Sequence, residues 1–69
     1  MSVARVVEIS STSTKGFDDA VVQGIARANQ TLRNVKSAWV KEQEAQVDNG
    51  KVVAYKVNLK VTFVLDGAS

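Results

Sequence analysis

The sequence of 69 residues contains no cysteine, no histidine and no proline. Without cysteine there are no disulfides and no thiolate metal sites, and without histidine the common zinc sites are excluded as well. The most frequent general base and the best nucleophile of enzymes are therefore both missing. We expect a protein that is not an enzyme, with no catalytic residues and no metal-ligating residues in its site.

Long hydrophobic runs and clusters of basic charge are also missing. No segment approaches the roughly 20 apolar residues that a membrane span needs, and residues 1–5 lack the apolar stretch of a signal peptide. The nine basic and seven acidic residues are scattered, with a net charge of +2. A nucleic-acid surface needs clustered basic residues with aromatics between them. We therefore expect a cytoplasmic protein without nucleic-acid or membrane partners.

The length permits a single domain over residues 1–69. A chain of this size buries only about 60% of the surface that its unfolded form exposes, so it is marginally stable alone. Disulfides, a structural metal or oligomerisation usually compensate for this. Because the composition excludes disulfides and the common metal sites, oligomerisation remains.

The strongest positive signal is a strict alternation near the C-terminus. Apolar residues occupy the odd positions of residues 53–65, namely Val53, Tyr55, Val57, Leu59, Val61, Phe63 and Leu65. This period of two predicts a strand with one buried face. Residues 51–65 would span roughly 50 Å at about 3.3 Å per residue, whereas a compact domain of this length is only about 30 Å across. One protomer cannot cover that face, and a second copy of the chain is the simplest partner.

The rest of the chain predicts one helix and two further strands. Residues 4–9 favour a short strand, and the small polar residues 10–16 favour a loop that supplies helix N-caps rather than an anion-binding cradle. A helical stripe runs through residues 17–32: Phe17, Ala20, Val21, Ile25, Ala28 and Leu32. Residues 36–47 form a second expected strand, and Asp48-Asn49-Gly50 is a strong hairpin signal. The expected fold is α+β, a β-α-β-β protomer whose three-stranded antiparallel sheet wraps around one helix.

Two features of the second expected strand have both structural and functional interpretations. Glu42 and Glu44 lie two residues apart and hence on one face of the strand. They could bind a cation, act as a pair of carboxylates, or simply belong to a solvated surface. Trp39 is the only tryptophan. The other residues expected on its face are polar, namely Ser37, Lys41 and Gln43. Trp39 is therefore either buried at a subunit interface or a stacking surface for a planar ligand.

Several short motifs, in this order and spacing, resemble the dodecin family over nearly the whole chain. They are Val6-Val7-Glu8-Ile9, Gly16-Phe17-Asp18-Asp19-Ala20, Gly24-Ile25-Ala26-Arg27-Ala28, Thr31-Leu32-Arg33-Asn34-Val35 and Val57-Asn58-Leu59-Lys60-Val61-Thr62-Phe63-Val64-Leu65. The resemblance implies the same β-α-β-β protomer, assembled as a hollow dodecamer. It also implies a ligand, because known members bind flavins, commonly stacked in pairs between Trp residues, and are thought to store or sequester them. Some relatives bind coenzyme A, and another branch binds calcium.

The sequence departs from the family at the expected flavin site. The family's stacking Trp aligns with Ser37, its covering Gln with Lys56, and a nearby Asp with Glu42. Trp39 lies two residues beyond Ser37 on the same face, about 7 Å along the strand, and offers a displaced stacking surface. Lys56 adds a cation that suits a phosphate-bearing flavin better than riboflavin. The expected cofactor-binding residues are Trp39, Ser37, Glu42, Gln46 and Lys56.

These observations favour a non-enzymatic flavin-binding protein for storage or sequestration, with FMN as the expected cofactor and a homododecamer as the expected assembly. The alternative is a dodecin-like shell that binds calcium, or a nucleotide such as coenzyme A, instead of flavin. The candidate cation ligands are then Glu42, Glu44 and Asp48. A third interpretation is an assembly with some other ligand.

Overall fold

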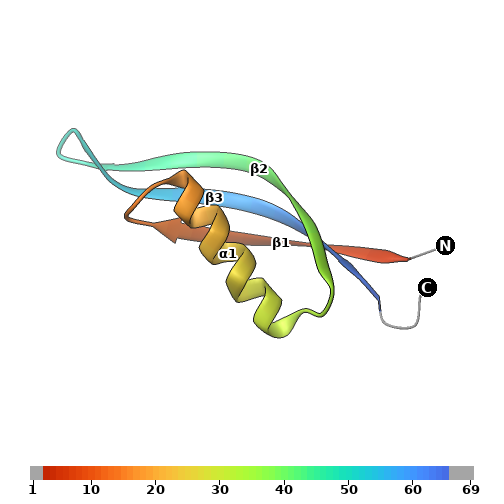
Figure 1. Ribbon diagram of the computed structural model, residues 1–69. Helices are drawn as coiled ribbons and strands as arrows, with labels where there is room; N and C mark the ends of the chain where they lie inside the picture. The colour runs from red at the N-terminus through yellow and green to blue at the C-terminus, as the bar shows by residue number, and fades with distance from the viewer. Residues whose placement is uncertain (1–2, 66–69) are drawn as a thin grey trace.

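A computed structural model describes residues 3–65, which form one helix and a three-stranded antiparallel sheet (Figure 1). The elements follow in the order β1 (Ala4–Ser13), α1 (Phe17–Thr31), β2 (Val35–Asp48) and β3 (Lys51–Val64). The sheet order is β1-β3-β2, so the last strand is central and pairs with both others. The predicted β-α-β-β order and the antiparallel sheet are confirmed. In the part of the chain described here, no helix is long and apolar enough to cross a membrane.

The core lies between α1 and one face of β3. Val57, Leu59 and Val61 are fully buried there, against Ala20 of the helix. The alternation of β3 places these odd-numbered side chains on one face, as its sequence predicts. The ends of the stripe are not covered, since Val53 remains 50% exposed and Leu65 39% exposed. The helix therefore covers only the middle of the apolar stripe.

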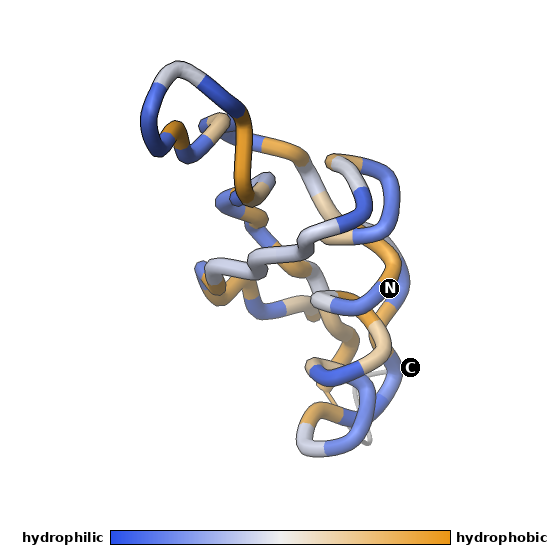
Figure 2. Tube along the Cα trace, turned by 90° about the vertical axis from the view of Figure 1, so that its left-hand side faces the viewer, coloured by the Kyte–Doolittle hydropathy of each residue, from blue (hydrophilic) through white to orange (hydrophobic). Residues whose placement is uncertain are grey.

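The end of the β2–β3 hairpin, residues 46–54, projects beyond the rest of the protomer (Figure 1), and we call it the arm. β1 pairs only with residues 55–64 of β3, so the end of the hairpin has no third strand beside it. The longest dimension is 51 Å and the radius of gyration is 14.1 Å, compared with about 11 Å for a compact chain of this length. The predicted long last strand is observed as Lys51–Val64, and it exceeds the width of a compact domain of this length. Hydrophobic and hydrophilic residues alternate along the chain in Figure 2, and the exposed apolar residues of the arm are Val47, Val52 and Val53.

β1 is longer than its sequence predicts. The small polar residues expected to form a loop continue the strand as far as Ser13, pairing in register from Ser10 opposite Asn58 to Ser13 opposite Tyr55. The loop expectation is wrong for these residues because β3 extends far enough to continue the backbone ladder. Such a ladder satisfies the backbone groups whatever the local propensity of serine and threonine.

The start of α1 also differs from the predicted side-chain cap. Its N-cap residue is Gly16, and no side chain caps the helix there. The Ser13 hydroxyl instead donates a hydrogen bond of 2.6 Å to Asp19 Oδ2 and accepts one of 2.9 Å from the Lys15 amide. Asp19 lies in the first helical turn, where its charge complements the helix dipole. Ser13 therefore ties the end of β1 to the first turn of α1.

Local geometry explains two of the glycines, Gly50 and Gly24. Gly50 and its neighbour Asn49 have φ angles of 75° and 52°, which is the left-handed conformation that a tight two-residue hairpin requires. The predicted turn is thus confirmed. Gly24 lies where the helix comes nearest to the sheet, and a Cβ atom there would lie 2.9 Å from Ser11 Cβ and 3.1 Å from Leu59 Cδ1. Helix and sheet can approach this closely only because residue 24 has no side chain.

Candidate functional site

The candidate site occupies the face of the sheet turned away from α1. The even-numbered residues Lys56, Asn58 and Lys60 of β3 point to this face, because the odd-numbered ones point to the helix. Residues paired directly across the sheet share a face, and we call each set of such residues a row. Successive rows lie about 6.6 Å apart along β3. This polar face is where the predicted ligand residues gather.

A bulge in β2 decides which of its side chains reach the polar face. Trp39 pairs with Lys60 and Glu42 pairs with Asn58, so one extra residue is inserted between Val40 and Glu42. Beyond this bulge Gln43 pairs with Val57 and therefore lies on the helix face. The expectation that Gln43 shares the face of Trp39 is wrong for this reason. The bulge brings Trp39 and Glu42 onto one face, although their numbers differ in parity.

All five predicted binding residues lie on the polar face, but they are spread along it. Ser37 pairs with Thr62 at one end and Gln46 with Ala54 at the other, roughly 26 Å apart along the strand. Trp39, Glu42 and Lys56 occupy the three rows between them. The structure therefore places these three in consecutive rows and leaves Ser37 and Gln46 one row outside on either side. Trp39 is 64% exposed, so the single chain leaves its ring accessible.

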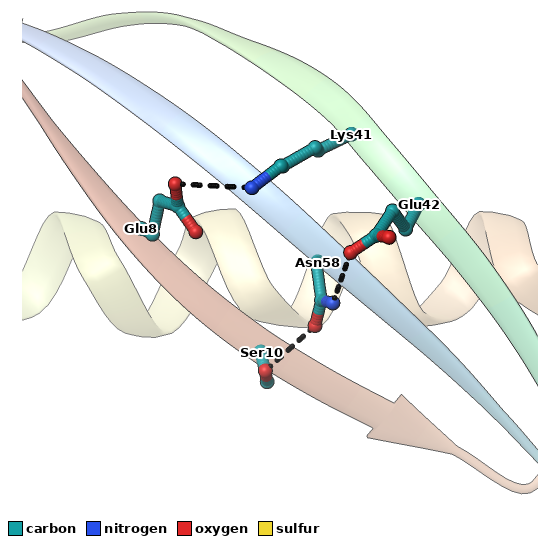
Figure 3. A network of polar contacts seen from close by, with 5 residues as sticks. All are labelled: Glu8, Ser10, Lys41, Glu42 and Asn58. Atoms are coloured by element: carbon teal, nitrogen blue, oxygen red, sulfur yellow. Dashed lines mark hydrogen bonds and ion pairs between the residues drawn. The ribbon is translucent and has the colours of Figure 1, made fainter.

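The middle row carries a hydrogen-bond chain across all three strands. Ser10 Oγ of β1 donates to Asn58 Oδ1 of β3 at 2.8 Å, and Asn58 Nδ2 donates to Glu42 Oε1 of β2 at 3.0 Å (Figure 3). We call these three residues the relay. Asn58 and Ser10 were not among the predicted site residues. The even-numbered position of Asn58 in the alternating strand was the signal that could have identified it.

A second contact crosses the sheet beside the relay. Lys41, the bulged residue, reaches over β3 and places its ammonium 3.4 Å from Glu8 Oε1 (Figure 3). Both side chains are largely exposed, and such pairs contribute only about 0.2–1 kcal/mol. This pair therefore contributes little to stability.

A shallow depression of about 220 Å³ lies next to the relay, lined by Glu42, Gln43, Glu44, Lys56 and Asn58. Of these residues, the ones on the polar face carry two carboxylates, one ammonium and one amide. These groups supply both hydrogen-bond donors and acceptors. The depression therefore suits a ligand that both donates and accepts hydrogen bonds.

The three candidate cation ligands do not converge. Glu44 pairs with Lys56, whereas Asp48 pairs with Lys51 near the tip of the hairpin, roughly 16 Å further along β3. Within residues 3–65, no group of three or more metal-ligating side chains comes together. A cation site made of Glu42, Glu44 and Asp48 in one protomer is therefore wrong.

Comparison with known proteins decides the family. The dodecin family model matches residues 3–66. This chain belongs to the dodecin family. The resemblance expected from its motifs is thereby confirmed over nearly the whole sequence.

Individual dodecins match over most of their length. The dodecin of Thermus thermophilus is 36% identical over 64 residues, which cover 93% of each chain. A calcium dodecin of Mycobacterium tuberculosis is 32% identical over 63 residues, covering 91% of this chain and 89% of that one. The solved structure of the dodecin from Streptomyces davaonensis has a TM-score of 0.90 and 40% identity, covering 94% of this chain and 96% of that one. The β-α-β-β protomer of this chain is thus the dodecin protomer.

Proposed function

We propose that this dodecin binds a flavin, FMN, on the polar face of its sheet and stores or sequesters it without catalysing a reaction. The observation that carries the proposal is the exposed Trp39 ring, one row away from the relay and two rows from Lys56. A planar ring system gains most from such an aromatic surface, through burial and stacking. FMN contains a planar ring and a phosphate, joined by a hydroxylated chain.

In this proposal each part of FMN has a neighbouring group. The ring would stack on Trp39, the chain would pass over the row of Glu42 and Asn58, and the phosphate would meet the Lys56 ammonium. The Trp39 row and the Lys56 row are about 13 Å apart along β3, and the flexible lysine stem adjusts the final position. Lys56 thus favours FMN over riboflavin, which has no phosphate.

The proposal includes assembly into the dodecameric shell of the family. Several large apolar side chains are exposed in the single chain, namely Trp39, the valines of the arm and Val22 at 61%. Neighbouring protomers would cover this surface. A second protomer near Trp39 would supply the other wall of the ligand site.

Fluorescence titration with FMN tests the proposal. The wild-type protein should quench FMN emission, and Trp39→Ala should bind at least about fivefold more weakly, since stacking on an aromatic side chain contributes about 1–3 kcal/mol. Val40→Ala is the matched control, because Val40 is exposed on the opposite face of the same strand. Unchanged FMN affinity in Trp39→Ala would refute the proposed site.

Calcium binding is the second candidate function, favoured by the relationship to the calcium dodecin of Mycobacterium tuberculosis. Glu42 and Glu44 lie in adjacent rows and offer two carboxylates. However, Asn58 already donates to Glu42, and the Lys56 ammonium lines the same depression, so both oppose a cation there. If calcium is the ligand, the melting temperature should rise with calcium and not with FMN.

A further inference from the structure

Each hydrogen bond of the relay has a defined direction from donor to acceptor. A carboxylate at neutral pH only accepts hydrogen bonds, so the Asn58 amide must turn its nitrogen toward Glu42. Its oxygen then faces Ser10, whose hydroxyl donates to it at 2.8 Å. The reversed amide would place two acceptors face to face at the 3.0 Å contact with Glu42. Asn58 is therefore held from both sides in one orientation.

This arrangement leaves specific groups unused. The relay occupies one Glu42 oxygen and one amide hydrogen of Asn58, whereas each of these groups has a second acceptor or donor. Both residues line the depression, together with Lys56. An acceptor oxygen beside a donor N–H is complementary to a hydroxyl group, which both donates and accepts.

We infer that Ser10 and Asn58 are positioning residues that hold the Glu42 carboxylate to accept hydrogen bonds from the hydroxylated chain of the ligand. This inference rests on the proposed function and concerns its specificity. It follows from the row order, since the relay lies between the stacking surface of Trp39 and the ammonium of Lys56. A ligand that spans those two groups must pass over Glu42. Hydroxyls on its chain would replace the water that otherwise solvates the free carboxylate oxygen.

The matched probes are riboflavin, which carries the hydroxylated chain without phosphate, and lumiflavin, which carries the ring alone. Asn58→Leu retains the approximate size of the side chain and removes both of its polar groups. We expect this substitution to weaken the binding of riboflavin about tenfold, in line with the loss of a hydrogen bond to a charged group. Lumiflavin affinity should stay within about twofold, because the ring contacts Trp39 and not the relay.

Two further variants separate positioning from general damage. Ser10→Ala should weaken the binding of riboflavin by about threefold. Ser10→Thr should bind riboflavin as the wild type does, since threonine retains the hydroxyl. Thr62→Val is the control, because Thr62 lies on the same face of β3 outside the relay. It should bind both flavins as the wild type does.

The outcomes distinguish this inference from the proposed function. If Asn58→Leu lowers the affinities for riboflavin and lumiflavin equally, or lowers neither, the positioning role is overturned. The Trp39→Ala variant then still tests the stacking site independently. If Asn58→Leu lowered the affinity for adenosine but not for riboflavin, the ligand would contain a ribose, and the assignment to the flavin chain would be overturned. If the wild type binds neither flavin, the proposed function fails and the inference fails with it.

Discussion

Trp39 and Glu42 lie on the same face of β2, although regular alternation would place them on opposite faces. Trp39 pairs with Lys60 and Glu42 pairs with Asn58, two residues apart on β3. The bulge leaves Lys41 unpaired, so the alternation resumes with Glu42 on the face of Trp39. An exposed aromatic ring and a hydrogen-bonded carboxylate thereby lie in adjacent rows.

Deletion of Lys41 tests this relationship directly. Without the extra residue, Trp39, Val40 and Glu42 follow one another in a regular strand, so Trp39 and Glu42 stay on one face and keep their partners Lys60 and Asn58. We therefore expect FMN affinity to stay within about twofold of the wild type, measured by fluorescence titration, with far-UV circular dichroism used to confirm that the fold is retained. Lys41→Ala keeps the extra residue and removes only the exposed pair with Glu8, so it should also bind FMN within about twofold of the wild type. Loss of FMN affinity in a folded deletion variant would contradict the assignment of Lys41 as an unpaired, bulged residue.

Lys56 should select for a phosphate. Lys56→Gln removes the cation that lines the depression, so FMN affinity should fall about fivefold to tenfold while riboflavin affinity stays constant. Raising the salt concentration should weaken FMN binding to the wild type more than to the variant, because salt screens exposed charges. Lys51→Gln is the control, since Lys51 lies near the hairpin tip opposite Asp48. An equal effect of Lys56→Gln on FMN and riboflavin would argue against a phosphate contact.

Gly24→Ala should destabilise the protein, although alanine is the better helix former. Alanine gains about 1 kcal/mol of helix propensity, but its Cβ atom would lie 2.9 Å from Ser11 Cβ and 3.1 Å from Leu59 Cδ1. Overpacking of this kind costs about 1–3 kcal/mol, so we expect a net loss of about 1 kcal/mol, measured by urea unfolding at fixed protomer concentration. The double variant Ser11→Gly/Gly24→Ala should show a favourable coupling relative to the two single changes. A Gly24→Ala protein more stable than the wild type would mean that the helix can move away from β1 at little cost.

The assembly state can be measured without any substitution. Size-exclusion chromatography with light scattering should give a particle of about 89 kDa, as expected for twelve chains of 7.4 kDa each. The physical reason is the apolar surface of the arm and of the helix, which a single chain leaves exposed. A monomer at micromolar concentration would contradict the proposed shell.

Much of the fold could be predicted because its signals are local and periodic. The odd-numbered stripe of the last strand identified Val57, Leu59 and Val61, which are the largest fully buried side chains of the described residues. The Asn49-Gly50 pair identified the hairpin, since few residues adopt positive φ without strain. The extension of β1 to Ser13 could not be predicted in this way, because it depends on a distant strand long enough to pair with it.

The candidate site could likewise be predicted only in part from the sequence. The residue types of the sequence alone determined that the proposed site draws on one tryptophan, on carboxylates and on lysines, and that cysteine and histidine are absent from it. Only the tertiary structure decided which of them are neighbours. A bulge and a strand register exist only between paired strands, so the chain by itself could not show that Glu42 joins Trp39, that Gln43 turns away, or that Ser10 and Asn58 hold Glu42 from across the sheet.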